Sequence, residues 1–233
     1  MNSSRATARL AGLLYLLFSL LAIFGYMYVP SQFVVSGDAA ATARKITEGA
    51  LMYRLGILSA LAGHILFIFL VLTLYDLFKD VNRRKARLMV ALVCVGVAGE
   101  IVNLGHRTAP LLLLSGADFL SVFTKPQLDA LALGFLRLGN HLGQLIGVFW
   151  GLWLFPFGLL TIRSGFFPRI LGILQIAAGV GYVVGTVTRL VFPAQAQVVS
   201  QFTTPLYIGE LPMVLWLLIV GARAPRAEVE QVS

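Results

Sequence analysis

Ionisable and amide side chains interrupt several long apolar stretches of this sequence, and they recur at helical spacing. Glu100, Asn103 and Arg107 fall at i, i+3 and i+7, so an α-helix places them on one face. A second stripe in a later apolar stretch consists of Arg137, Asn140, His141 and Gln144. A charge at the centre of a bilayer costs about 2.5–3.5 kcal/mol, so residues of this kind are expected to line a site or to pair with one another.

Two further apolar stretches carry polar faces of the same kind. Their members are Gln175, Tyr182, Thr186 and Arg189 in one stretch, and Tyr207 and Glu210 in the next. Arg54 adds a cation at the end of an earlier stretch. If these stretches are membrane helices, nearly all of the polar residues lie at one level. We therefore predict a polar, outward-opening cavity between the helices.

The chemistry of these side chains suggests two sets of roles. We predict acid–base catalysis by Glu100, His141 and Glu210, because a carboxyl group can donate a proton and an imidazole can relay it. The residues predicted to bind a ligand are Arg54, Asn103, Arg137, Asn140, Gln144, Tyr182, Arg189 and Tyr207. The same groups can also join helices through static Glu–Arg and amide hydrogen bonds, and the pattern leaves both interpretations open.

The three histidines have no spacing typical of a metal or haem site. There is no HExxH motif and no pair of histidines four residues apart. Glu100, His141 and Glu210 can supply three metal ligands, and His106 and His141 two axial haem ligands, but nothing in the spacing requires either. We therefore predict no metal site and leave the cofactor unassigned. His64 is predicted to be a neutral, hydrogen-bonded packing residue.

These residues are set in a very apolar chain. Of its 233 residues, 58% are hydrophobic and only 12% are charged, against about 25% charged in soluble domains. A soluble fold of this size could not cover its surface with so few charges, so the composition indicates an integral membrane protein. The formal net charge is +8, but the basic residues flank the apolar stretches. We attribute the charge to topology and lipid contact rather than to nucleic-acid binding.

Six stretches are long and apolar enough to cross a bilayer as helices, which needs about 20 residues. They are residues 10–29, 51–75, 88–105, 138–162, 170–192 and 206–222. Their continuous apolar character does not fit the alternation of a β-barrel. We therefore predict an all-α, polytopic membrane helix bundle with six transmembrane helices in a single domain over residues 1–233.

The basic residues also predict the orientation. With the N-terminus inside, eleven of the 18 Lys and Arg residues lie on the inner side, and four of them, Arg83, Arg84, Lys85 and Arg87, share one short loop. The positive-inside rule then places both termini in the cytoplasm and the chain in the inner membrane.

The outer loops are predicted to be structured. Asp38 is expected to cap a short helix. Thr124 and Gln127 are expected to form a capping box at the start of a helix that continues into the fourth span. Residues 110–122 are apolar but too short to span, and we expect them to lie at the outer interface or to dip back into the membrane.

Glycine and proline predict where helices approach and end. Gly139, Gly143, Gly147 and Gly151 recur every four residues, which favours the close approach of another helix. Pro30 is expected to end the first span.

Several motifs resemble a family of bacterial membrane proteins. They are Gly151-Leu-Trp-Leu-Phe-Pro-Phe-Gly158, Arg163-Ser-Gly-Phe-Phe-Pro-Arg-Ile-Leu-Gly-Ile-Leu174, Arg9-Leu-Ala-Gly-Leu-Leu-Tyr15, Leu74-Tyr75 with Val81-Asn82-Arg83, and Glu210 through Trp216-Leu-Leu to Gly221. They are similar to the family catalogued as domain of unknown function 4386, and the resemblance covers nearly the whole chain. It implies a multi-pass bacterial inner-membrane protein of about six helices, and it implies no reaction.

Three functions remain open. The first is a cavity that binds or transports a small amphipathic or lipid-like ligand, with the polar end of the ligand at Arg137, His141 and Arg189. The second is an intramembrane enzyme that uses Glu/His acid–base chemistry on a hydrophobic substrate. The third is a structural or accessory membrane subunit. Membrane lipids and a small amphipathic ligand are the expected partners, nucleic acid is not, and the oligomeric state is not predicted.

Overall fold

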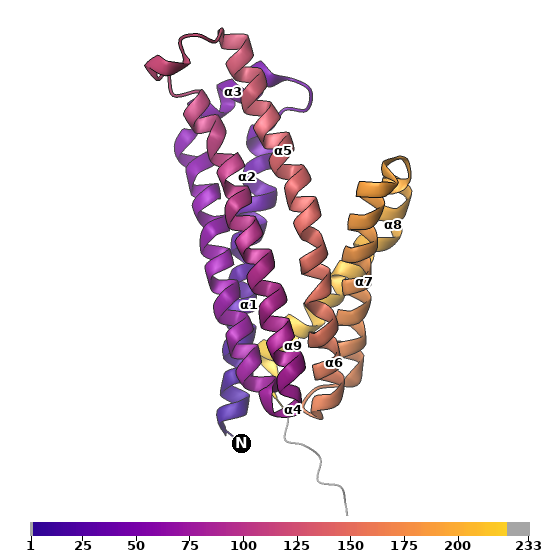
Figure 1. Cartoon of the computed structure of the whole chain (residues 1–233). Coiled ribbons are helices and arrows are strands. Elements are labelled where there is room, and N and C mark those ends of the chain that lie inside the picture. Colours follow the sequence, from indigo (N-terminus) through magenta and orange to yellow (C-terminus); the bar gives the residue numbers. More distant parts are fainter. Residues whose placement is uncertain (1, 223–233) are drawn as a thin grey trace, which may run out of the picture. The chain divides into compact units, whose positions relative to one another are not determined.

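The chain folds into helices joined by short turns, with no strand in the part that the structure describes (Figure 1). This computed structural model describes residues 2–222. Five helical stretches are long and apolar enough to cross a membrane: Ser4–Phe33, Ala50–Leu113, Lys125–Ser164, Arg169–Val191 and Pro193–Ile219. The predicted all-α fold of apolar helices is confirmed, whereas the count of six crossings and the position of the termini stay predictions. Two of the eleven basic residues predicted to lie on the inner side, Arg223 and Arg226, are outside the described residues.

The second and third predicted spans form a single helical element, α4 (Ala50–Leu113). A straight helix of its 64 residues would be about 96 Å long, about three times the thickness of the bilayer core. Asn82 interrupts it with non-helical backbone angles (φ −161°, ψ 98°), and its side chain accepts a hydrogen bond of 2.9 Å from the Lys85 N–H. Beyond this point the chain reverses, and the Tyr53 hydroxyl donates to the Arg107 carbonyl at 2.8 Å. Thus α4 is a hairpin whose two arms lie side by side.

The first span continues past Pro30, which was predicted to end it. After α1 (Asn2–Ala22), residues Ile23–Tyr28 form the π-helix η1, and α2 (Val29–Phe33) follows without a loop. The Val29 N–H bonds to the carbonyl of Phe24, five residues earlier. Pro30 stands in the first turn of α2 and has no N–H to donate to the preceding π-helix, where the Gly25 carbonyl accepts from Arg107 Nη1 at 3.0 Å. The prediction was wrong because it treated Pro30 as a helix breaker rather than as a first-turn residue.

The predicted Asp38 cap is present, and so is the Gln127 half of the predicted capping box. Asp38 accepts a 2.8 Å hydrogen bond from the Ala41 N–H at the start of α3 (Ala39–Glu48). The Gln127 side chain accepts a 2.8 Å bond from the Thr124 N–H, and α5 (Lys125–Leu152) runs directly into the predicted fourth span. These signals were readable because each cap is made by residues three positions apart.

Residues 110–122 do not form a helix of their own. Their first four residues complete α4, and the remainder holds a turn and the short helix η2 (Asp118–Leu120). The segment therefore serves as the connection between α4 and α5. Its position relative to a membrane stays a prediction.

The remaining helices are α6 (Leu154–Ser164), α7 (Arg169–Val191), α8 (Ala196–Tyr207) and α9 (Leu211–Ile219). The bounds of α7 agree with the predicted fifth span to within one residue. Short 3-10 helices, η3 (Pro193–Gln195) and η4 (Ile208–Glu210), join the last elements. The sixth predicted span therefore belongs to a helical stretch that begins at Pro193 rather than at residue 206.

The chain divides into two compact units, which are described separately. Unit 1 comprises Met1–Leu16, Ile68–Val95 and Gly147–Ser233, and unit 2 comprises Leu17–Phe67 and Gly96–Ile146. The arms of α4 therefore contribute to both units.

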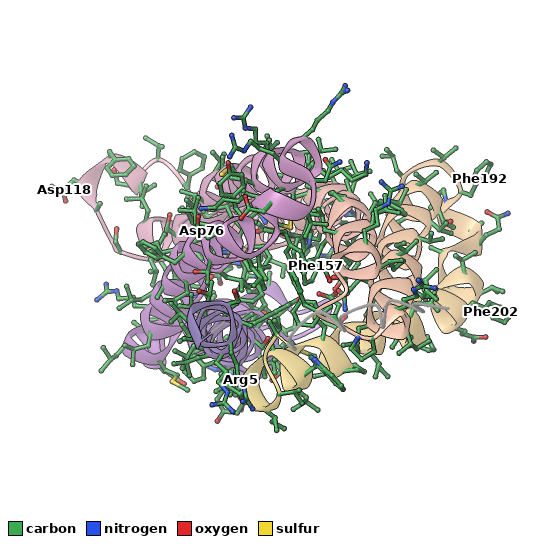
Figure 2. The ribbon with its side chains drawn as sticks, turned by 90° about the horizontal axis from the view of Figure 1, so that it is seen from below. Arg5, Asp76, Asp118, Phe157, Phe192 and Phe202 are labelled. Carbon is green, nitrogen blue, oxygen red and sulfur yellow. The ribbon has the colours of Figure 1, made fainter. Side chains whose placement is uncertain are left out.

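Unit 1 has an aromatic interior. Phe157 is fully buried in it and stacks on Trp153, with ring centroids 5.2 Å apart. Phe192 and Phe202 lie at its edge instead and are mostly exposed (Figure 2). Within this unit α7 packs against both α6 and α8.

Candidate functional site

Unit 2 buries a set of polar side chains that we call the Glu100 cluster: Tyr26, His64, Glu100, Asn103 and Arg107. The Glu100 side chain is buried, and one of its oxygens accepts hydrogen bonds from Asn103 Nδ2 and from the Tyr26 hydroxyl, each at 3.2 Å. Glu100 and Asn103 thus share a face, as their spacing predicts. Tyr26 was not among the predicted site residues.

Arg107 binds the π-helix rather than a carboxylate. Its guanidinium carbon lies 4.3 Å from the centre of the Tyr26 ring, and its Nη1 donates to the Gly25 carbonyl at 3.0 Å. The ring therefore lies beneath a cation while its hydroxyl donates to Glu100. Glu–Arg pairs, one of the predicted interactions, do not occur: the salt bridges within residues 2–222 are Lys79–Asp76 and Lys125–Asp129.

His64 has the packing role expected of it. It is buried, and its Nδ1 lies 2.8 Å from the Ala60 carbonyl one turn earlier on α4. Its ring also meets the Tyr26 ring edge-on, with centroids 5.8 Å apart. The π-helix thus places Tyr26 between a histidine, a carboxylate and a guanidinium.

A narrow cavity lies beside Arg107 in unit 2. Its volume is about 40 Å³, and its lining includes Tyr53, Arg107 and Asn140. A water molecule needs about 10–15 Å³ of such space, whereas small-molecule sites usually measure about 300–1,000 Å³. This cavity therefore suits a few waters and is too small for an amphipathic ligand.

Unit 1 holds a second polar set, the Glu210 cluster: Tyr15, Tyr182, Tyr207 and Glu210. The Tyr15 hydroxyl donates to Glu210, and Tyr182 also hydrogen-bonds to the Glu210 side chain. Tyr182 and Tyr207 stack with centroids 4.1 Å apart and ring planes 18° apart. The carboxyl group is therefore held by phenols.

Local structure fixes the position of Glu210. It ends the short helix η4, and α9 begins at the next residue. Gln175 Nε2 of α7 donates to the Gly209 carbonyl at 3.3 Å, which ties this turn to α7. The turn therefore presents Glu210 at a fixed position beside the tyrosine carried by α7.

The polar stripe of α5 points outward. Arg137, Asn140, His141 and Gln144 are all exposed. A different face of α5 packs against the Glu100 cluster, because a Cβ added to Gly143 would lie 3.3 Å from Asn103 Nδ2. His141 is therefore exposed on α5 rather than buried with Glu100.

The other predicted residues have mixed surroundings. Arg54 is exposed at the start of α4. Arg189 lies beside Tyr207: a Cβ on Gly185 would lie 3.0 Å from the Tyr207 hydroxyl and 3.2 Å from an Arg189 Nη. The Nε of Arg189 is buried and has no hydrogen-bond partner among the described residues.

The three predicted acid–base residues occupy three different environments. Glu100 lies in the buried cluster of unit 2, Glu210 in the cluster of unit 1, and His141 on the exposed stripe of α5. Within residues 2–222, no group of three or more His, Cys, Asp and Glu side chains is arranged to hold a metal ion. The structure therefore does not assemble the three-ligand set that the sequence allows.

Comparison with known proteins places this helical chain in a family. Residues 10–221 match the family described as Domain of unknown function (DUF4386). The chain belongs to this family. An uncharacterized protein of Archaeoglobus fulgidus is 33% identical to the DUF4386 chain over 76 residues, which are 33% of this chain and 44% of that protein. The match thus spans less than half the length of that relative. No solved structure matches the chain.

Two tyrosines of this DUF4386 chain belong to its clusters although they were not predicted. A buried tyrosine hydroxyl needs a hydrogen-bond partner, so Tyr15 and Tyr26 in an apolar stretch were a usable signal. Tyr15 also ends one of the motifs that resemble the family. Neither position, however, shows which carboxylate the hydroxyl meets, because the two partners lie far apart in the sequence.

Proposed function

We propose that this DUF4386 protein is a multi-pass inner-membrane protein that binds a small amphipathic ligand against the exposed stripe of α5 (Arg137, Asn140, His141 and Gln144). The observation that carries the proposal is the exposure of this stripe on a helical stretch apolar enough to cross a membrane. Under the predicted topology the stripe lies toward the outer side, and both termini lie inside a bacterial cell.

The cost of polar groups in lipid supports this proposal. A cationic or polar side chain that faces acyl chains is costly, so such a stripe normally faces water, a ligand or another protein. In unit 2 the buried hydrogen bonds of Glu100 are made by Asn103 and Tyr26. The stripe therefore makes none of these hydrogen bonds, although Asn140 lines the small cavity beside Arg107.

The composition of the stripe favours an anionic headgroup. Arg137 carries a positive charge, the other members are amides and an imidazole, and the stripe contains no carboxylate. Leu138 and Leu145 are also exposed and flank the stripe on α5. A cationic polar strip beside an apolar strip matches a single-chain anionic amphiphile, with its head at Arg137 and its tail along the leucines.

A binding measurement tests the proposal. The purified full chain is titrated with a fluorescent long-chain fatty acid and, separately, with the same fluorophore on a zwitterionic lysophospholipid. We expect saturable binding of the fatty acid and a rise in Kd of about 10-fold or more for Arg137→Gln, because hydrogen bonds to charged groups contribute about 1.5–3 kcal/mol. Arg84→Gln, which removes an exposed cation of the α4 turn, is the matched control and should leave the Kd unchanged. Equal binding by the wild type and Arg137→Gln, or no saturable binding, would contradict the proposal.

The Glu210 cluster supports a second candidate function, an intramembrane acid–base enzyme. The Glu210 carboxyl group forms no salt bridge within the described residues, and it hydrogen-bonds to the phenols of Tyr15 and Tyr182. A carboxyl group and a phenol can both exchange protons with a substrate. Mass spectrometry of lipids that purify with the wild type and with Glu210→Gln separates the two functions. A different molecule retained by Glu210→Gln indicates an accumulated substrate, whereas the same molecule in both indicates binding alone.

A further inference from the structure

A groove of about 520 Å³ in unit 2 is lined by residues of α3, the end of α4 and the start of α5. These elements meet at one end of unit 2 (Figure 1). Leu114 and Leu128 contribute apolar walls. Four charged residues also line it: Arg44, Glu48, Lys125 and Asp129. Its volume lies within the usual range of small-molecule sites, about 300–1,000 Å³. None of these residues belongs to the α5 stripe, so the inference below does not depend on the proposed function.

Two of the three charged residues on α3, Arg44 and Glu48, form no salt bridge within residues 2–222. Both are exposed and stand one helical turn apart, about 6 Å along the axis. Their order explains the missing salt bridge, because a helix favours the acidic residue on the N-terminal side of an i, i+4 pair, and here the arginine comes first. Both groups thus remain available to a bound molecule.

Asp129 supplies a buried acceptor on the opposite side of the groove. Its side chain is 5% exposed, and its Oδ2 accepts a 2.8 Å hydrogen bond from the Lys125 ammonium, whose side chain is 76% exposed. Its Oδ1 is buried and has no hydrogen-bond partner in the part of the chain that the structure describes. A buried carboxylate oxygen without a donor is costly, so this atom lacks one hydrogen-bond donor. Both members of this ion pair, the exposed Lys125 and the buried Asp129, line the groove.

We propose that this groove binds a small zwitterion that carries a primary ammonium and an anionic group, as in phosphoethanolamine. The ammonium donates to Asp129 Oδ1 and faces Glu48, and the anionic group faces Arg44 and Lys125. Two acidic and two basic side chains give the lining no net charge, which disfavours a simple cation or a simple anion. A quaternary ammonium has no N–H to donate, so the groove should discriminate against choline compounds.

Such a zwitterion has two sources: a free molecule in the aqueous phase, or the headgroup of an ethanolamine lipid. The full chain is reconstituted in phosphatidylcholine nanodiscs and titrated calorimetrically with phosphoethanolamine and with phosphocholine. In a second arm, native mass spectrometry compares the retention of phosphatidylethanolamine and phosphatidylcholine by the protein. Saturable binding of phosphoethanolamine in the first arm identifies the free zwitterion. Selective retention of phosphatidylethanolamine in the second arm, displaced by added phosphoethanolamine, identifies the lipid.

Three variants connect the binding to the groove. Asp129→Asn and Arg44→Gln should each raise the Kd for phosphoethanolamine at least 10-fold, or abolish the selective lipid retention. Lys45→Gln removes the neighbouring charge of α3, whose ammonium donates to the Gln32 carbonyl outside the groove, and should leave binding intact. Helical content by circular dichroism checks folding, and if Asp129→Asn unfolds, the exposed Arg44→Gln decides.

Two results overturn the proposal. One is the absence of both phosphoethanolamine binding and ethanolamine-lipid selectivity in the wild type. The other is binding by Arg44→Gln equal to that of Lys45→Gln. Fatty-acid binding that depends on Arg137 would be unaffected by either result, so a failure of this inference and a failure of the proposed function are distinguishable.

Discussion

Two glutamates of this protein, the buried Glu100 and the half-buried Glu210, are accommodated in different ways. Glu100 accepts from an amide and a phenol, and the same phenol ring supports the guanidinium of Arg107. Glu210 is held by the hydroxyls of Tyr15 and Tyr182. In unit 2 an arginine lies over the phenol ring that donates to the carboxylate. In unit 1 both hydrogen bonds come from phenols.

Two glycine contacts, one in each unit, differ in what an added methyl group would meet. In unit 1, a Cβ on Gly158 would lie 2.5 Å from the Gly172 carbonyl oxygen, so glycine is required for backbone contact between α6 and α7. In unit 2, a Cβ on Gly143 would lie 3.3 Å from the Asn103 side chain. We infer that the contact at Gly158 is rigid and that the contact at Gly143 has room to adjust. Close backbone approach is not confined to unit 1, because a Cβ on Gly25 in unit 2 would lie 2.8 Å from the Gly56 carbonyl oxygen.

The largest effect is expected at the glycine contacts. Gly158→Ala should lower the free energy of unfolding by about 2–3 kcal/mol, because the backbones of α6 and α7 must separate. Gly143→Ala should cost under about 1 kcal/mol, because the Asn103 amide can shift. Unfolding in detergent, followed by circular dichroism, measures both. Equal losses in the two variants would remove the distinction between the two contacts.

A smaller effect should distinguish the two carboxyl clusters. A double-mutant cycle with Tyr15→Phe and Glu210→Gln should give a coupling free energy of about 1–2 kcal/mol, near the upper end for interhelical hydrogen bonds in membranes. The cycle with Tyr26→Phe and Glu100→Gln should give about 0.5 kcal/mol, because Asn103 still donates to residue 100 and the Arg107 contact with the ring survives. A larger coupling for the Tyr26 pair would reverse the comparison.

The smallest effect is expected where a glycine of α5 faces open space. A Cβ on Gly134 would meet no atom within 4 Å, so Gly134→Ala should leave stability unchanged or raise it by up to about 0.5–1 kcal/mol through helix propensity. The same unfolding assay measures it and provides the control for Gly143→Ala. A loss comparable to that of Gly158→Ala would show that α5 tolerates no added methyl group anywhere.

The features predictable from the sequence are those set by neighbouring residues. The Asp38 cap, the Thr124–Gln127 contact and the shared face of Glu100 and Asn103 all depend on spacings of three residues. The apolar runs likewise predicted the helices, because length and hydropathy are local properties.

The features that could not be predicted depend on distant parts of the chain. Tyr15 and Glu210 are 195 residues apart, and no spacing rule connects them. The sequence also could not show that Glu100, Glu210 and His141 lie in separate environments. Helical periodicity predicts which face of a helix a residue occupies, but it does not predict which helix packs against that face. Pro30 was misinterpreted because its effect depends on the π-helix that precedes it.

The central claim is that the polar stripe of α5 faces water or a ligand rather than acyl chains. In a Cys94→Ser background, Asn140→Cys and His141→Cys are compared with Leu138→Cys, which lies at the same depth on the flanking apolar strip. The proteins are reconstituted in liposomes and treated with a water-soluble maleimide. The account predicts that the Asn140 and His141 positions react at least several-fold faster than the Leu138 position, and that a bound long-chain fatty acid slows them. Equal, slow labelling of all three positions would contradict it.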